Sequence, residues 1–160
     1  MKGYLPEGSK ESALTVSPPS FTLSALERAM ERGNILEAPA ILCDSDMNLH
    51  VALGEFIGII PKEEVAYHPK NFPTKEIAIL TRVGKMVNFR VKQITRKDGK
   101  VHVLLSRRDA QKECFLKYIS TLCAGDVIRA KVTHMESFGV LVELRSHVLS
   151  FDGCKGTYFF

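Results

Sequence analysis

The stretch from Thr95 to Leu144, TRKDGKVHVLLSRRDAQKECFLKYISTLCAGDVIRAKVTHMESFGVLVEL, decides how the chain is organised. It opens with the turn signal RKDG and continues into KVHVLLS, which has the character of a strand. A short charged segment of helical pattern follows, and a new strand-like pattern begins at Gly125-Asp126-Val127. The stretch therefore predicts the end of one β unit, a linker helix over 109–123 and the start of another unit.

Four further strand-like segments precede this stretch. They are NILEAPAILCD (34–44), NLHVALG (48–54), FIGIIP (56–61) and MVNFRVKQI (86–94). In the second and the fourth, apolar residues alternate with more polar ones, which predicts one buried face and one exposed face. Pro39 interrupts the first segment, so we expect a sheet edge or a bulge there.

Five short strands with a long connection after the third, residues 62–85, match a small closed barrel of the oligonucleotide-binding type over residues 34–108. Periodicity alone is equally compatible with another small five-stranded barrel. Within the connection, the pattern allows a short helix at 62–66. We therefore expect a mostly β fold.

The residues before the first strand divide into two parts. Residues 1–21 are rich in Ser, Pro, Gly and charge, so we expect a flexible tail that buries little apolar area. In residues 22–33, apolar side chains recur at helical spacing and Gly33 supplies a C-terminal stop. The pattern predicts a lead-in helix of roughly ten residues, with Thr22 or Ser24 as its N-cap.

The segment after the linker helix repeats the beginning of the first unit. Gly125-Asp126-Val127-Ile128 parallels Gly33-Asn34-Ile35-Leu36, and the series Val140, Val142, Leu144 parallels Leu49, Val51, Leu53. This internal repeat predicts two copies of one unit. The linker helix between them is expected to gather its apolar side chains on one face, with Phe115, Tyr118, Ile119 and Leu122. Residues 124–160 are a partial second repeat, because 145–160 lack the turn and the last two strands of the first.

Four stretches share their pattern with a known family. They are FIGIIPKEEV (56–65), VGKMVNFRVKQI (83–94), RKDGKVHVLLSRR (96–108) and GDVIRAKVTHMESFGVLVEL (125–144). They resemble the third-strand turn, the fourth and fifth strands, and the Gly-x-Val…Phe-Gly-x-x-Val-x-Leu opening of the S1 domain, the RNA-binding barrel of bacterial ribosomal protein S1. The resemblance covers residues 33–144 and implies an oligonucleotide-binding fold, in tandem repeats like those of ribosomal protein S1.

The resemblance also implies a binding face, on which aromatic rings stack on bases and cations neutralise phosphates. In the first copy, Met47-Asn48 stands at the Phe-Gly position of the family and Pro61 at a His position. Thr95 stands near an Asp position, and only His50 and Lys100 keep the expected chemical type. This copy is therefore either a structural barrel or one that contacts RNA or the ribosome through a basic face.

The candidate RNA-binding residues are the cations, and the rings that could stack on bases. In the first copy they are His50, Arg90, Lys92, Lys97, Lys100, His102 and Arg107, and in the second Arg129, Lys131, His134 and Phe138. Phe138-Gly139 matches the motif of the family, and Leu141 replaces its second aromatic residue. The alternative for Phe138 is a buried core position.

The composition of the chain limits which partners, metal sites and membrane segments can be expected. The chain has 160 residues and a formal net charge of +4, which is an ordinary globular composition with a weak preference for anionic partners. The four cysteines and five histidines lack the spacing of metal ligands, so we expect no metal and no cofactor. No apolar run is long enough to cross a membrane and no signal peptide is recognisable, so we expect a cytoplasmic protein.

No nucleophile elbow, phosphate-binding loop or acid–base pair is recognisable, so we expect a binding protein and not an enzyme. The resemblance implies binding of single-stranded RNA or mRNA through a basic barrel face, in translation or in RNA metabolism. The alternative is a module that docks on the ribosome, a ribosomal protein or another protein, with little RNA binding of its own. The loss of aromatic positions in the first copy favours this alternative.

Overall fold

The computed structural model of the chain describes residues 20–68, 74–97, 99–123, 126–127, 131–136, 139–144, 147–152 and 158–159. Residues 1–19, most of the expected tail, lie outside this set. Five strands make up the first unit: β1 (Leu36–Cys43), β2 (Leu49–Ala52), β3 (Ile57–Ile60), β4 (Met86–Lys97) and β5 (Lys100–Ser106). The five strands expected from the sequence are all present.

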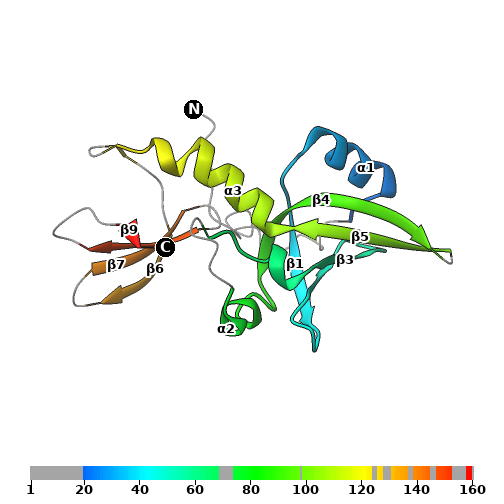
Figure 1. Ribbon diagram of the computed structural model, residues 1–160, viewed down its shortest axis with the longest axis horizontal. Helices are drawn as coiled ribbons and strands as arrows, with labels where there is room; N and C mark the ends of the chain where they lie inside the picture. Colours follow the sequence, from blue (N-terminus) through cyan, green and yellow to red (C-terminus); the bar gives the residue numbers. More distant parts are fainter. Residues whose placement is uncertain are drawn as a thin grey trace.

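These five strands form a mixed sheet that closes into a ring in the order β1-β2-β3-β5-β4, with β4 pairing back to β1 (Figure 1). All the pairs are antiparallel except β3 with β5, which is parallel. The parallel pair requires a long crossover, and residues 61–85 before β4 are part of it. We call this five-stranded unit the ring.

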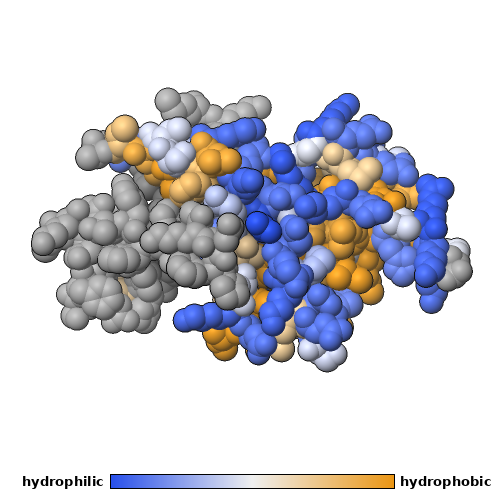
Figure 2. Space-filling view, in the orientation of Figure 1, coloured by the Kyte–Doolittle hydropathy of each residue, from blue (hydrophilic) through white to orange (hydrophobic). Residues whose placement is uncertain are grey.

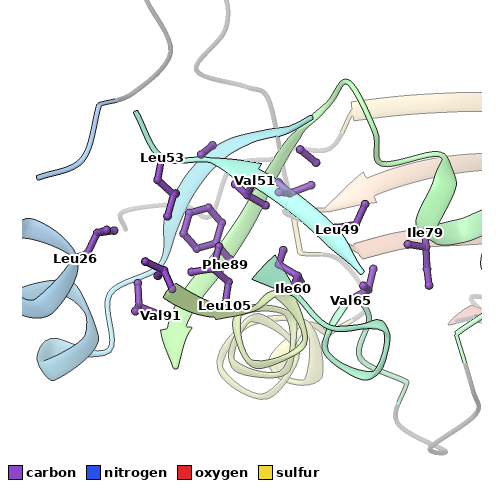
Figure 3. Close-up of a cluster of buried hydrophobic side chains, with 14 residues drawn as sticks. Leu26, Leu49, Val51, Leu53, Ile60, Val65, Ile79, Phe89, Val91 and Leu105 are labelled. Atoms are coloured by element: carbon purple, nitrogen blue, oxygen red, sulfur yellow. The ribbon is translucent and has the colours of Figure 1, made fainter. Parts of the chain in front are cut away.

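The interior of the ring is apolar. Phe89 of β4 is fully buried and lies in the middle of a cluster that includes Val51, Ile60 and Leu105 (Figure 3). Leu26 lies at one end of the cluster and Val65 and Ile79 lie at the other end. The alternation in β2 and β4 therefore gives the buried face that the sequence predicts.

Pro39 lies where β1 changes partners. Residues Leu36 to Pro39 of β1 pair with β4, whereas Ala40 to Cys43 pair with β2, with a bulge between Ala40 and Leu42. Proline has no N–H to donate to a ladder, so this changeover is a position that tolerates it. Pro39 itself pairs with Met86 and the bulge follows it between Ala40 and Leu42, so the expected bulge lies next to Pro39 and not at it.

The lead-in helix is α1 (Leu23–Arg32), ten residues as predicted, and it contacts β4. The Thr22 side chain accepts a hydrogen bond from the N–H of Ala25, so Thr22 and not Ser24 is the N-cap. Gly33 ends the helix with a φ of 62°, a left-handed conformation that favours glycine.

The connection between β3 and β4 contains two short helices. The first, η2 (Lys62–Glu64), lies within the expected 62–66 segment. The second, α2 (Glu76–Leu80), was not predicted; it has five residues, of which only Ile79 is buried. Such a helix is too short to show a reliable periodicity.

The linker helix is α3 (Arg107–Lys117), followed by η3 (Ile119–Thr121). It begins two residues earlier than the expected 109, because the Ser106 side chain caps the N–H of Asp109. Its buried residues are Arg107, Ala110, Gln111 and Cys114, with Ile119 after it. Of the residues expected on its apolar face, Phe115, Tyr118 and Leu122 are half-buried, and only Phe115 lies within α3, which ends at Lys117.

A four-stranded antiparallel sheet follows in the order β6-β7-β8-β9. Its strands are β6 (Lys131–Glu136), β7 (Gly139–Leu144), β8 (His147–Asp152) and β9 (Tyr158–Phe159). β8 lies within the segment that the sequence left without strands, as does the short β9. We call this unit the second sheet.

The pairing in the second sheet reproduces that of β1, β2 and β3. Val132 pairs with Val142 and His134 with Leu141, with a bulge between them, as Ala40 pairs with Val51 and Leu42 with His50. The β7–β8 register likewise repeats the β2–β3 register, so that Val142 faces Leu149 as Val51 faces Gly58. The shared register and bulge support the internal repeat. In the described part of the chain, no helix has the length and apolar character that a membrane span requires.

Candidate nucleic-acid interface

Two exposed lysines lie on the hairpin of β4 and β5, which extends beyond the rest of the unit (Figure 1). Lys97 pairs with Lys100, and Thr95 pairs with His102. Residues that face each other in an antiparallel pair share one side of the sheet, as do residues two apart in a strand. One side of the hairpin therefore carries five exposed residues, which we call the hairpin face: Gln93, Thr95, Lys97, Lys100 and His102.

An apolar strip continues the hairpin face onto the ring. Leu104 pairs with Gln93 on one side and with Ile59 of β3 on the other. Ile57, two residues before Ile59, is 53% exposed, while Ile59 and Leu104 are half-buried. Figure 2 shows hydrophobic surface over β3 and β5 beside the hydrophilic end of the hairpin. Cations and apolar surface thus lie next to each other on the outside of the sheet.

The opposite side of the hairpin faces α1. Arg96 Nη2 lies 3.3 Å from Glu27 Oε1, while Ile94 and Val101 pack against the core. Arg96 is therefore turned away from the hairpin face, and the ion pair helps to hold the hairpin in place. Both groups are largely exposed, so the pair stabilises the hairpin only weakly.

His50 lies in β2 opposite Ile59 of β3, and its ring contacts the hydrogen-bonded turn between β1 and β2. Its Nε2 lies 3.1 Å from Oδ2 of Asp44, and the carboxylate of Asp44 also accepts from the backbone N–H groups of Asn48 and Asp46. The N–H of Asn48 and the His50 ring lower the pKa of Asp44 to about 2 from its ordinary 3.8. Met47 adopts a left-handed φ of 65° in this turn. The residues of this turn hold its shape, and His50 is half-buried.

Arg90 and Lys92 are engaged with acidic residues of the same chain. Arg90 forms an ion pair with Glu113 of α3, which also pairs with Lys117. Lys92 Nζ lies 3.3 Å from Asp109 and 3.4 Å from Glu64. Desolvation lowers the pKa of Lys92, but the hydrogen bonds and charges of Asp109 and Glu64 outweigh it and raise the pKa above 10.5. These two cations bind α3 and η2 to the ring, so they offer little free charge to a ligand.

Arg107 is an internal residue, which argues against the role expected for it as a free cation. It is only 3% exposed, and its Nη1 donates to the carbonyl oxygen of Val65 at 3.0 Å. Nearby, the Gln111 side chain accepts from the N–H of Tyr67 at 2.7 Å. Arg107 and Gln111 therefore fasten α3 to the segment that follows η2.

The candidate residues of the second sheet are less defined. Lys131 and His134 lie in β6, and only their backbone positions are described. Arg129 and Phe138 lie outside the described residues. The expected roles of these four residues remain predictions.

The structure brings together three of the predicted residues, Lys97, Lys100 and His102. Arg90 and Lys92 are instead engaged in ion pairs, and Arg107 is buried. Sequence reasoning missed the apolar strip, although the alternation in the third strand contains the signal: Ile57 and Ile59 face opposite to the buried Ile60. It could not find the partners of Arg90 and Arg107, which come from distant segments.

The hairpin face and the apolar strip can together bind a flexible polyanion, with cations for its charges and apolar surface for its bases. Within the described residues, no group of three or more His, Cys, Asp and Glu side chains is placed to hold a metal ion. No protein-family model and no curated protein sequence matches the chain.

Proposed function

We propose that the chain is an RNA-binding protein of the S1 type, whose ring is an oligonucleotide-binding barrel that holds single-stranded RNA on its hairpin face and apolar strip. The fold part of the proposal is supported by the strand order β1-β2-β3-β5-β4. Barrels of this type bind oligonucleotides on the face of their second and third strands and on the loops that join strands 1 to 2 and 4 to 5.

The observation that carries the proposal is the exposed group Lys97, Lys100 and His102 on one side of the β4–β5 hairpin, next to the apolar strip. The two lysines neutralise phosphates, and the exposed ring of His102 offers a stacking surface for a base. Ile57, Ile59 and Leu104 contact further bases without sequence preference. The proposal includes a role in translation or RNA metabolism in the cytoplasm.

The test is a titration of the chain with a short mixed-sequence single-stranded RNA at several salt concentrations. Reversing both hairpin charges, Lys97→Glu with Lys100→Glu, is expected to weaken binding about tenfold or more. The dependence of log K on log salt becomes shallower by about 1.4, because each lost phosphate contact contributes about 0.7 for single strands.

The matched control reverses two exposed lysines elsewhere, Lys75→Glu with Lys85→Glu, which gives the same net charge. This control is expected to retain most of the affinity. Equal weakening by both double variants would show that net charge alone attracts the RNA and would contradict a site on the hairpin face.

A second candidate function is protein docking, and the apolar strip is the observation that favours it. Ile57 is 53% exposed and aliphatic, in a region where a stacking aromatic ring would serve RNA better. If protein docking is the function, the wild-type chain does not bind the RNA even at low salt. The same titration therefore separates the two functions.

A further inference from the structure

We propose that the outer edge of β6 pairs with β6 of a second copy of this chain, across a two-fold axis, and joins two second sheets into one. Among the described residues, β6 is an edge strand that pairs only with β7. An unpaired strand edge presents N–H and C=O groups to which another strand can bond. This proposal is independent of RNA binding.

Two exposed apolar side chains mark β6. Val132 is 57% exposed and Met135 is 74% exposed. They pair with Val142 and Val140, which are two residues apart, so the bulge places both of them on the same face of the sheet. Their counterparts in the ring, Ala40 and Cys43, pair with the fully buried Val51 and Leu49. Val132 and Met135 therefore lie on the face that forms the interior in the ring.

The sequence of β6 is complementary to itself in one antiparallel register. With Val132 opposite Met135 of the second copy, Lys131 faces Glu136 and Thr133 faces His134, each pair occurring twice. This register is also consistent with the bulge, which places Val132 and Met135 on one face of β6. Opposite charges and apolar pairs directly across two strands stabilise their pairing.

The choice of a second copy as the partner follows from this complementarity. Any strand can bond to an open edge, but a second β6 supplies both an acidic and a basic residue at the matching positions. In a two-fold dimer the same contacts occur twice, so a single substitution changes two pairs.

The test is sedimentation equilibrium of the 160-residue chain over a range of concentrations. The wild-type chain is expected to show a monomer–dimer equilibrium. Lys131→Glu places two carboxylates opposite each other in both pairs, and Glu136→Lys does the same with two ammonium groups. Each single variant is expected to raise the dimer Kd about tenfold, while the double variant, which restores opposite charges, returns it close to the wild-type value.

Lys85→Glu, an exposed charge reversal in the ring, is the control and is expected to leave the dimer Kd unchanged. Recovery in the double variant shows that these two positions meet, and circular dichroism of each single variant checks that it is folded. The proposal is overturned if the wild-type chain is monomeric at the highest concentration reached. It is also overturned if the single variants dimerise like the wild type, or if the double variant fails to recover.

Discussion

The ring and the second sheet begin with the same three-stranded meander and end differently. In both, the first two strands carry a bulge at the same position and the second and third strands have the same register. In the ring, β5 then pairs in parallel with β3, whereas in the second sheet β9 pairs antiparallel with β8. A meander is therefore specified locally, but its closure depends on strands that return from far along the chain.

One position shows what closure requires. At Gly58 of β3, an added Cβ would lie 2.9 Å from Cγ of Leu105 and 3.0 Å from Cδ1 of Leu53, closer than side chains pack. The register places Leu149 at the matching position of β8. If β3 had a leucine at this position, its side chain would collide with Leu105, and β5 could not pair with β3 in the present way. At this position the ring has a glycine where the second sheet has a leucine.

The largest effect is expected when the leucine of the second sheet replaces the glycine at position 58 of the ring. Gly58→Leu forces the new side chain into Leu105 and Leu53, and we expect the free energy of unfolding to fall by about 3 kcal/mol or more. Urea denaturation followed by circular dichroism measures the loss. If Leu105 is the obstacle, Gly58→Leu combined with Leu105→Ala costs less than the sum of the two single variants. Strict additivity would contradict this account of closure.

A smaller effect is expected where α3 leaves the ring. Arg107→Met keeps the aliphatic length of the side chain but removes the donor to the carbonyl of Val65, and we expect a loss of about 2 kcal/mol. Thermal and urea unfolding give the value. Lys112→Met, an exposed substitution in the same helix, is expected to change stability by less than about 0.5 kcal/mol. A similar small loss in Arg107→Met would mean that this contact does not fasten α3.

The smallest effect concerns the turn between β1 and β2. The pKa of Asp44 is lowered from 3.8 to about 2, so its ionised form stabilises the fold above pH 4, and this contribution is lost as the pH falls from about 4 to about 2. Asp44→Asn is expected to lower the melting temperature at neutral pH. The difference from wild type should shrink over that acidic range. A difference that stays constant down to pH 2 would contradict this assignment.

The strand pattern of the ring could be read from the sequence mainly because β2 and β4 alternate. Val87, Phe89 and Val91 point inward as predicted, and the caps of α1 at Thr22 and Gly33 follow from local signals. The buried face of α3 could not be predicted, because Arg107 and Gln111 are buried by polar contacts with Val65 and Tyr67. These contacts join segments more than 40 residues apart, and hydrophobic periodicity carries no information about them.

Only part of the candidate site could be predicted from the sequence, because contacts between distant segments again decide the rest. Lys97, Lys100 and His102 lie beside a local turn signal, and their exposure follows from the hairpin. Arg90 and Lys92 also alternate with buried residues, but whether an outward cation is free depends on what packs over it. α3 and η2 bring Glu113, Asp109 and Glu64 to them.

The attachment of α3 has a consequence for how the chain leaves the ring. Its first turn is held by Ser106, Arg107 and Gln111, and its middle by the pair of Arg90 and Glu113, so α3 is a stiff spacer and not a flexible tether. Eleven residues of helix are about 16 Å long, at about 1.5 Å for each residue. The end of α3 is therefore held at a fixed distance from the ring, and over this length the entropy of a loose linker plays little part.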